Sequence, residues 1–261
     1  MSARYRLDHG IVIRRKALPS GDVVVTLLAP HGKWRAVARK GRLPGGNLGR
    51  LSLFHDVTVQ YYRKREEDLA LLTQVRLNGA LPRLAHPDIY PYAHILAELA
   101  DALSVDVHIG EPLYQYLASG LRGLDAHADP SKVALLYAWR LLGLAGLAPR
   151  SGNCTHGGAS VPPAALDVPA GKLVCAECEA TVWLGTDAAD ELRLLLEAPM
   201  RQALSLPLAD RAGHWRALAR YVAYHVAELR SLEGSVSGPA TGPGVERPGG
   251  NAPQGEELFG V

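Results

Sequence analysis

The chain has only three cysteines among 261 residues, and all of them lie in one short stretch, from Cys154 to Cys178. Such clustering argues against a disulfide framework distributed over a secreted fold. No apolar run approaches the roughly 18 residues that a membrane-spanning helix needs. The N-terminal segment is charged and lacks the apolar core of a signal peptide. We therefore expect a cytoplasmic protein without a membrane partner.

Acidic residues are scarce at the start of the chain. Residues 1–80 hold 15 Lys/Arg against 6 Asp/Glu, a net charge of +9, whereas the remaining 181 residues hold 13 against 20, a net charge of −7. The formal net charge of +2 therefore conceals a basic module. A cationic surface of this density is typical of nucleic-acid-binding proteins. The alternative is a solvated basic face that binds nothing.

Five short segments of the basic module have the apolar pattern of strands, and turn-forming or charged residues separate them. The predicted strands are residues 10–14, 23–28, 34–38, 53–62 and 69–75. Five strands in about 70 residues suit a small closed barrel. We expect residues 1–80 to form this barrel and to carry the nucleic-acid-binding surface.

After residue 81 the apolar residues recur at helical spacing. The predicted helices are residues 92–103, 113–124, 130–148, 187–196, 199–206 and 212–232. The third is the clearest, because Asp129 is a suitable N-cap and Pro130 a suitable first residue. The predicted fold class is therefore α+β multidomain: a barrel, then an α-helical domain.

The helical domain is interrupted and is followed by a tail. Its helices occupy residues 81–149 and 183–233, and a loop-rich insertion with all three cysteines occupies residues 150–182. Residues 234–261 contain 8 Gly and 4 Pro. Such a segment buries too little apolar surface to offset the entropy of ordering, so we expect a disordered tail. Its Glu256–Phe259 stretch could be a docking motif, but ordinary tail is the simpler interpretation.

Cationic residues surround the predicted strand at 34–38 and the glycine-rich loop at 41–49. Arg35, Val37 and Arg39 share one face of this strand, because alternate residues point the same way. Phosphates would bind such a face mainly through counterion release. The aromatic residues available to stack on bases are Trp34, Tyr61 and Tyr62. The loop does not match a nucleotide-binding phosphate loop, because no Gly-Lys-Ser/Thr follows at the required spacing.

The cysteine cluster has the spacing of a zinc ribbon or knuckle. Its candidate metal ligands are Cys154, His156, Cys175 and Cys178. Thiolates and imidazole suit tetrahedral Zn²⁺, and four protein ligands would make the site structural, not catalytic. The first pair is one residue tighter than a usual C-x-x-C. The alternatives are Asp167 as fourth ligand, no fourth protein ligand, or three reduced cysteines without metal.

The sequence offers no arrangement typical of an enzyme. Asp101, Asp106 and Glu111 lie close together but are interpreted as solvated residues, and His225 as a histidine satisfied at an interface. A zinc-dependent enzyme would need an open coordination position, which four protein ligands deny. We therefore expect no catalytic activity.

The order of these parts resembles the bacterial RecO family of DNA repair proteins. The resemblance is carried by the strings GIVIRRK, GDVVVTLL and HGKWRAVARKG at residues 10–16, 21–28 and 31–41. It continues through residues 51–55 and 71–74, the helices and the cysteine loop, and it covers residues 5–232. It implies an N-terminal OB-fold, an α-helical domain, and a zinc-binding loop inserted in the latter.

The resemblance also implies a function. Members of this family are recombination mediators of the RecF pathway, which bind single- and double-stranded DNA and anneal complementary strands. They contact the single-strand-binding protein and, with RecR, help to load RecA. The DNA-binding residues carried over are Arg14, Arg15, Lys33, Arg35, Arg39, Lys40 and Arg42. The acidic helical domain is expected to form a groove for a partner peptide.

The rival interpretation is a generic OB-fold module that binds single-stranded nucleic acid without mediator activity. Binding of RNA as tightly as DNA, without annealing, would favour it.

Overall fold

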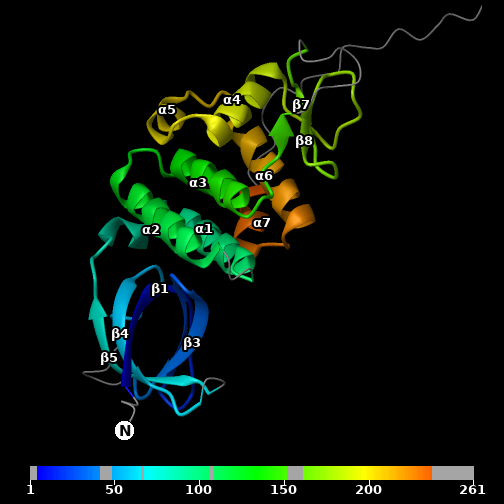
Figure 1. Ribbon diagram of the computed structural model, residues 1–261. Helices are drawn as coiled ribbons and strands as arrows, with labels where there is room; N and C mark the ends of the chain where they lie inside the picture. The colour runs from blue at the N-terminus through cyan, green and yellow to red at the C-terminus, as the bar shows by residue number, and fades with distance from the viewer. Residues whose placement is uncertain (1–4, 42–48, 66–67, 106–108, 152–160, 237–261) are drawn as a thin grey trace, which may run out of the picture.

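A computed structural model describes residues 5–41, 49–65, 68–105, 109–151 and 161–236. A barrel forms one end of the molecule, a layered group of helices the middle, and a small sheet packs at the other end (Figure 1). Along the described segments, no helix is both long and apolar enough to cross a membrane.

The barrel contains five strands, as predicted. They are β1 (Tyr5–Ala17), β2 (Val23–Ala29), β3 (Gly32–Ala38), β4 (Asp56–Tyr62) and β5 (Ala70–Leu77). Their order is β1-β2-β3-β5-β4, and β4 pairs with β1 to close the barrel. Strands β3 and β5 are parallel, and the other neighbours are antiparallel. A closed five-stranded barrel of this order is an OB-fold.

The strand predicted from residue 53 begins only at Asp56. Phe54 has a φ of 69°, a left-handed conformation that a strand cannot contain. This turn buries the Phe54 ring against helix α1 (Tyr90–Leu103), where its centroid lies 5.5 Å from that of Tyr90 and 5.0 Å from that of His94. The segment before β4 therefore serves to attach the barrel to the helices.

A β-bulge in β1 lies directly after apolar residues that alternate between two cores. The register with β2 shifts between Val12 and Arg14, so Ile13 is the additional residue. Val12 belongs to the core inside the barrel, whereas Ile11 and Ile13 belong to the core shared with the helices. The barrel and the helical domain are therefore packed against each other through a continuous apolar interface.

The helical domain begins with a short 3-10 helix, η1 (Pro82–Ala85), and contains α1 (Tyr90–Leu103), α2 (Gly110–Ala126), α3 (Pro130–Leu144), α4 (Thr186–Glu197), α5 (Met200–Ser205), α6 (Arg211–His225) and α7 (Arg230–Val236). The predicted cap of α3 is confirmed, since the Asp129 carboxylate accepts a hydrogen bond from the Lys132 N–H at 3.1 Å. Gly110 begins α2 so close to the β2–β3 turn that an added Cβ would lie 2.7 Å from the Pro30 carbonyl oxygen.

The single helix predicted at 212–232 is wrong, because the structure has two helices, α6 and α7. The cause is a contact that the local sequence does not contain. Glu98 on α1 accepts hydrogen bonds from the Arg230 N–H at 3.3 Å and the Ser231 N–H at 2.9 Å. This carboxylate caps a new helix at Arg230, and the intervening Leu229 is nevertheless buried. Apolar periodicity therefore could not reveal the break.

The described part of the insertion, residues 150–151 and 161–182, contains strands that its composition does not predict. It forms β6 (Arg150–Ser151), β7 (Ala165–Asp167) and β8 (Lys172–Val174), and with β9 (Val182–Trp183) these make a sheet of order β6-β8-β7-β9. Strands of two or three residues are too short to show an alternating pattern. His225 joins this sheet to α6 by donating from Nε2 to the Val168 carbonyl oxygen at 2.7 Å, as expected of a satisfied interface histidine.

Candidate nucleic-acid interface

Two rows of paired residues cross the outer face of β1, β2 and β3. In one row, Arg14 pairs with Thr26 and Thr26 with Arg35; in the next, Lys16 pairs with Val24 and Val24 with Val37. Arg39, two residues beyond Val37, lies on the same side. We call Arg14, Lys16, Arg35, Arg39, Val24 and Val37 the basic face. Its four cationic residues are all exposed.

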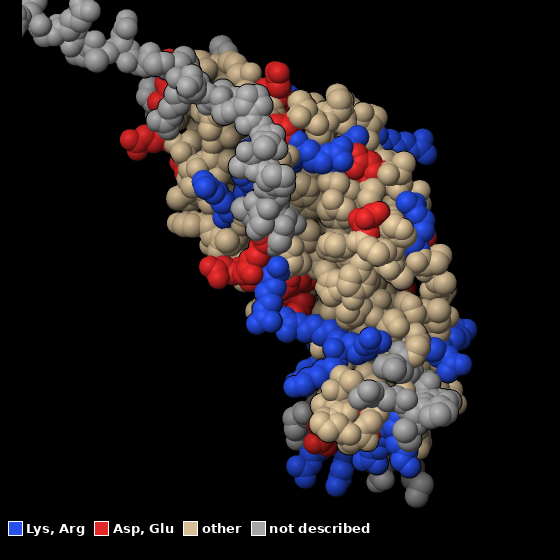
Figure 2. All heavy atoms as spheres, turned by 180° about the vertical axis from the view of Figure 1, so that it is seen from behind, with Lys and Arg blue, Asp and Glu red and all other residues tan. Residues whose placement is uncertain are grey.

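The distribution of charge over the side of the molecule drawn in Figure 2 agrees with this local arrangement. Lys and Arg side chains gather on the barrel and at its junction with the helices, whereas Asp and Glu lie mainly over the helical part (Figure 2). The basic face belongs to residues 1–80, which carry a net charge of +9, as an anion-binding surface requires.

The β1 bulge decides which predicted residues belong to this face. Without the additional Ile13, Arg14 would follow the side of Val12 and turn toward the barrel interior. Arg15 pairs with Val25, an interior residue, so it lies on the opposite side of the strand from Arg14, although it is exposed. Lys16, in contrast to Arg15, lies on the basic face. It was not among the predicted DNA-binding residues, because the bulge leaves no signal in the residue pattern.

Lys33 lies at the edge of the basic face and binds Asp101 of α1. Its Nζ donates to Oδ1 of Asp101 at 2.9 Å and to the Asp101 carbonyl oxygen at 3.0 Å. The Arg14 guanidinium forms an ion pair with the other carboxylate oxygen. Asp101 is 3% exposed. Its interpretation as a solvated residue is wrong, because the two cations of the barrel cover it. Asp106, its predicted neighbour, lies outside the described residues, and Glu111 is exposed as expected.

Lys40 follows β3 in a left-handed conformation with a φ of 50°. Its N–H donates to Oδ1 of Asp22 at 2.8 Å, and this bond, with one from Ser20, lowers the pKa of the Asp22 carboxyl. The β1–β2 loop is thereby fixed against the end of β3, next to Arg39. Arg42, the last predicted DNA-binding residue, lies outside the described residues.

Two of the three predicted stacking residues are not available to bases. Tyr61 is 7% exposed and belongs to the barrel core, and the Trp34 ring packs against it with centroids 4.9 Å apart. The Arg63 guanidinium lies over both rings, at 5.6 Å from the Trp34 centroid and 5.5 Å from that of Tyr61. Trp34 and Tyr61 point inward because strand alternation places them on the side opposite Arg35 and Tyr62.

The loop between β4 and β5 adds cations next to this face. Lys64 and Arg65 are exposed there. In OB-folds this loop and the β1–β2 loop flank the ligand face of β2 and β3. These residues were not selected from the sequence, because their place beside the ligand face follows from the barrel topology.

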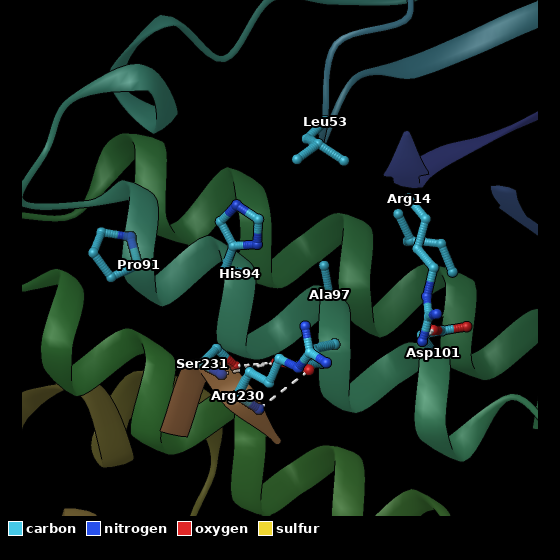
Figure 3. Close-up of a pocket in the computed structure, with 10 residues that line it drawn as sticks. Arg14, Leu53, Pro91, His94, Ala97, Asp101, Arg230 and Ser231 are labelled. Carbon is cyan, nitrogen blue, oxygen red and sulfur yellow. Dashed lines mark hydrogen bonds and ion pairs between the residues drawn. The ribbon is translucent and has the colours of Figure 1, made fainter. Parts of the chain in front are cut away.

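A groove of about 790 Å³ lies at the edge of the contact between the barrel, α1 and α7 (Figure 3). Its apolar lining includes Leu53, Pro91 and Ala97. Its charged lining consists of two cations and two carboxylates: Arg14, Arg230, Glu98 and Asp101. Arg14 points across the groove toward Asp101 in Figure 3, so it belongs to both the groove and the basic face. The two surfaces therefore adjoin at one residue.

Glu98 holds the far wall of this groove in place. Burial opposes its ionisation, but hydrogen bonds from Ser231 and Arg230 outweigh burial and lower the pKa of Glu98 from its ordinary value of 4.5. A carboxyl with a lowered pKa stabilises the fold above its ordinary pKa, and this contribution is lost as the pH falls through the folded-state value.

We therefore expect Glu98→Gln to reduce the free energy of unfolding at pH 7, with a difference from wild type that shrinks below about pH 4. Urea unfolding at a series of pH values measures this. Glu228→Gln, which changes an exposed carboxylate, is the control. A deficit that stays constant down to acid pH would show that the charge of Glu98 does not hold α7.

The cysteine pair has a geometry that fits half of a zinc site. The sulfur atoms of Cys175 and Cys178 lie 3.6 Å apart, and the Cys178 N–H donates to the Cys175 carbonyl oxygen at 3.3 Å. Two thiolates at about 2.3 Å from a tetrahedral zinc ion are roughly 3.8 Å apart. The other two predicted ligands, Cys154 and His156, lie outside the described residues. Within the described part of the chain, no group of three or more His, Cys, Asp or Glu residues could hold a metal.

A closed barrel of this topology, with a basic outer face and an attached helical domain, defines an OB-fold protein of two packed parts. Comparison with family models identifies the same two parts. The model for the recombination protein O N terminal matches residues 1–80, and that for the recombination protein O C terminal matches residues 86–233. The chain therefore belongs to the RecO family, which confirms the resemblance found in the sequence.

Similar curated proteins carry the name DNA repair protein RecO. That of Streptomyces griseus is 31% identical over 236 residues, which cover 86% of this chain and 90% of the relative. That of Bifidobacterium adolescentis is 31% identical over 212 residues, covering 77% and 85%. That of Streptomyces coelicolor is 35% identical over 182 residues, covering 66% and 73%. The similarity thus extends over both parts of the fold.

Proposed function

We propose that this protein acts in DNA repair as a recombination mediator that binds DNA and anneals complementary strands. With RecR, it helps to load RecA on strands coated by the single-strand-binding protein. The name of the relatives supports the role in repair. The observation that carries the proposal is the basic face, where four exposed cations lie on the ligand side of an OB-fold.

Annealing requires two strands to approach against the repulsion of their phosphates. A cationic surface lowers this repulsion and releases condensed counterions, and it does so without reading the sequence. Binding that is weak at each contact lets the strands shift until their bases are in register. This mechanism needs neither ATP nor a catalytic residue, so we propose a protein that is not an enzyme.

The test is annealing of two complementary fluorophore-labelled oligonucleotides by the purified full chain, without ATP, across a salt titration. The proposal predicts acceleration that fades as salt rises, because salt displaces the phosphates from the basic face. Binding without annealing would instead favour a generic single-strand-binding module.

The groove between the barrel, α1 and α7 is the proposed site for the tail of the single-strand-binding protein. Its guanidinium groups, Arg14 and Arg230, suit acidic side chains, and its apolar lining suits the hydrophobic residues of such a peptide. Titration of a labelled tail peptide onto the full chain and onto an Arg230→Glu variant tests this proposal. Equal affinity for both chains would place the peptide elsewhere.

A structural zinc ion is the proposed cofactor, held by Cys175 and Cys178 together with Cys154 and His156. We expect Cys175→Ser to reduce the zinc content from about one ion per chain to near zero. The same variant should lower Tm by about 5 °C, because zinc stabilises only the folded loop. Metal analysis and thermal unfolding measure both effects.

DNA binding serves as the internal control for this variant, since the barrel lies at the opposite end of the molecule from the small sheet. Wild-type protein that is expressed with ample zinc and yet contains none would support the alternative of three reduced cysteines.

A further inference from the structure

A row of apolar and aromatic residues continues the basic face around the outside of the barrel. Val37 of β3 pairs with Leu71 of β5, Leu71 with Tyr62 of β4, and Tyr62 with Tyr5 of β1. We call these four residues the apolar row. Adjacent strands are about 4.8 Å apart, so the row crosses four strands and about 14 Å of surface. It shares Val37 with the basic face.

The apolar row faces away from the interior of the barrel. The residues that alternate with it, Tyr61, Leu72 and Ala36, belong to the barrel core. None of its four members belongs to or packs against either hydrophobic core of the described residues. Tyr5 is 58% exposed, and Leu7, two residues along the same face of β1, is 74% exposed. Val37, Tyr62 and Leu71 are partly exposed. A contiguous set of apolar residues that the cores leave open to solvent marks an interaction surface.

The charges beside the row indicate what it contacts. Arg35 and Arg39 flank Val37 at two residues on either side, so cations and apolar side chains share one surface. The Tyr5 and Tyr62 rings form a pair with centroids 5.9 Å apart and an interplanar angle of 56°. A chain that carries both planar apolar groups and regularly spaced anions complements this surface, and an unpaired nucleic-acid strand is such a chain.

We infer that Tyr5 and Tyr62 stack on unpaired bases while Arg35 and Arg39 hold the neighbouring phosphates, and that the row makes the barrel prefer single strands over duplex. The inference rests on the proposed function, because it takes the basic face to be the DNA site. Bases in a duplex have both faces covered by neighbouring pairs, so only an unpaired strand offers faces to the row. Duplex DNA then contacts the basic face through its phosphates alone.

The test compares the full chain with the double variant Tyr5→Ala/Tyr62→Ala, using fluorescence anisotropy of a labelled oligothymidylate and of a duplex of equal length. Loss of two stacking rings is expected to weaken single-strand binding roughly tenfold or more and duplex binding by less than about twofold. The dependence of single-strand affinity on salt should stay unchanged, since no cation is removed. Tyr224→Ala, at an exposed tyrosine of α6, is the control.

Two further measurements identify stacking as the cause. The conservative double variant Tyr5→Phe/Tyr62→Phe keeps both rings and should bind oligothymidylate as wild type does. An oligonucleotide in which abasic sites replace the bases should bind wild type and the alanine variant equally, because it offers nothing to stack. A wild-type advantage that persists on the abasic strand would overturn the inference.

The outcomes separate this inference from the proposed function. Unchanged single-strand affinity in the alanine variant, together with loss of affinity in Arg35→Glu/Arg39→Glu, overturns the stacking role alone and leaves the row as a protein contact. Equal loss on single strands and duplex in the alanine variant also overturns it, since stacking cannot act on duplex. Unchanged affinity in the charge-reversal variant overturns the basic face itself.

Discussion

Reversal of two charges on the basic face, in the double variant Arg35→Glu/Arg39→Glu, is expected to lower affinity for a single-stranded oligonucleotide roughly 100-fold at low salt. Each arginine lost removes one phosphate contact, and each glutamate adds a repulsion at the same place. The slope of log affinity against log salt should become shallower by about 1.5, since each single-strand contact contributes about 0.7. Fluorescence anisotropy over a salt series measures both quantities.

A control variant with the same change in net charge separates local from global electrostatics. Lys172→Glu/Arg201→Glu reverses two exposed cations on the small sheet and α5, far from the barrel. It should leave the salt slope near its wild-type value. If the two double variants lose affinity equally, or if the slope of the first stays unchanged, the basic face is not the principal DNA site.

The central residues of the basic face could be predicted from the local sequence, because strand alternation is a short-range rule. Arg35, Val37 and Arg39 were expected to share a face. The register with β2 places Arg35 and Val37 so, and Arg39 follows directly after the strand. The same rule could have separated the aromatic residues that face outward from those that face the barrel interior. Trp34 alternates with Arg35 and Tyr61 with Tyr62, so at most one member of each neighbouring pair can face outward. The barrel, similarly, could be predicted from five short strand patterns and the turns between them.

The rest depends on contacts that are distant in sequence. The bulge at Ile13 lets two successive residues of β1 face outward, so that Ile13 packs on the helices while Arg14 pairs with Asp101 of α1. Glu98 caps α7 from more than 130 residues away. Asp101 is polar and lies near other acidic residues, so its burial becomes visible only when the barrel is packed on α1. Such features are properties of the assembled fold, and no window of sequence contains them.

The position of Asp101 links the stability of the molecule to the charge available for DNA. Its carboxylate holds Lys33 and Arg14 against α1, and it also neutralises part of the charge that these cations would offer to phosphate. The Arg14 side chain is 70% exposed despite this contact, so a phosphate can reach it. A single buried carboxylate therefore acts on folding and on DNA binding in opposite directions.

Asp101→Asn is accordingly expected to have two effects of opposite sign. The free energy of unfolding should fall by about 1–2 kcal/mol, less than for a fully buried ion pair, because both cations remain partly exposed to water. Affinity for single-stranded DNA at low salt should rise several-fold, because Arg14 and Lys33 no longer face a carboxylate. Urea unfolding and anisotropy measure the two effects on one preparation. Asp88→Asn, at an exposed carboxylate with the same change in charge, should change neither by much. Loss of stability accompanied by weaker DNA binding would show that Asp101 positions these cations for DNA and does not restrain them.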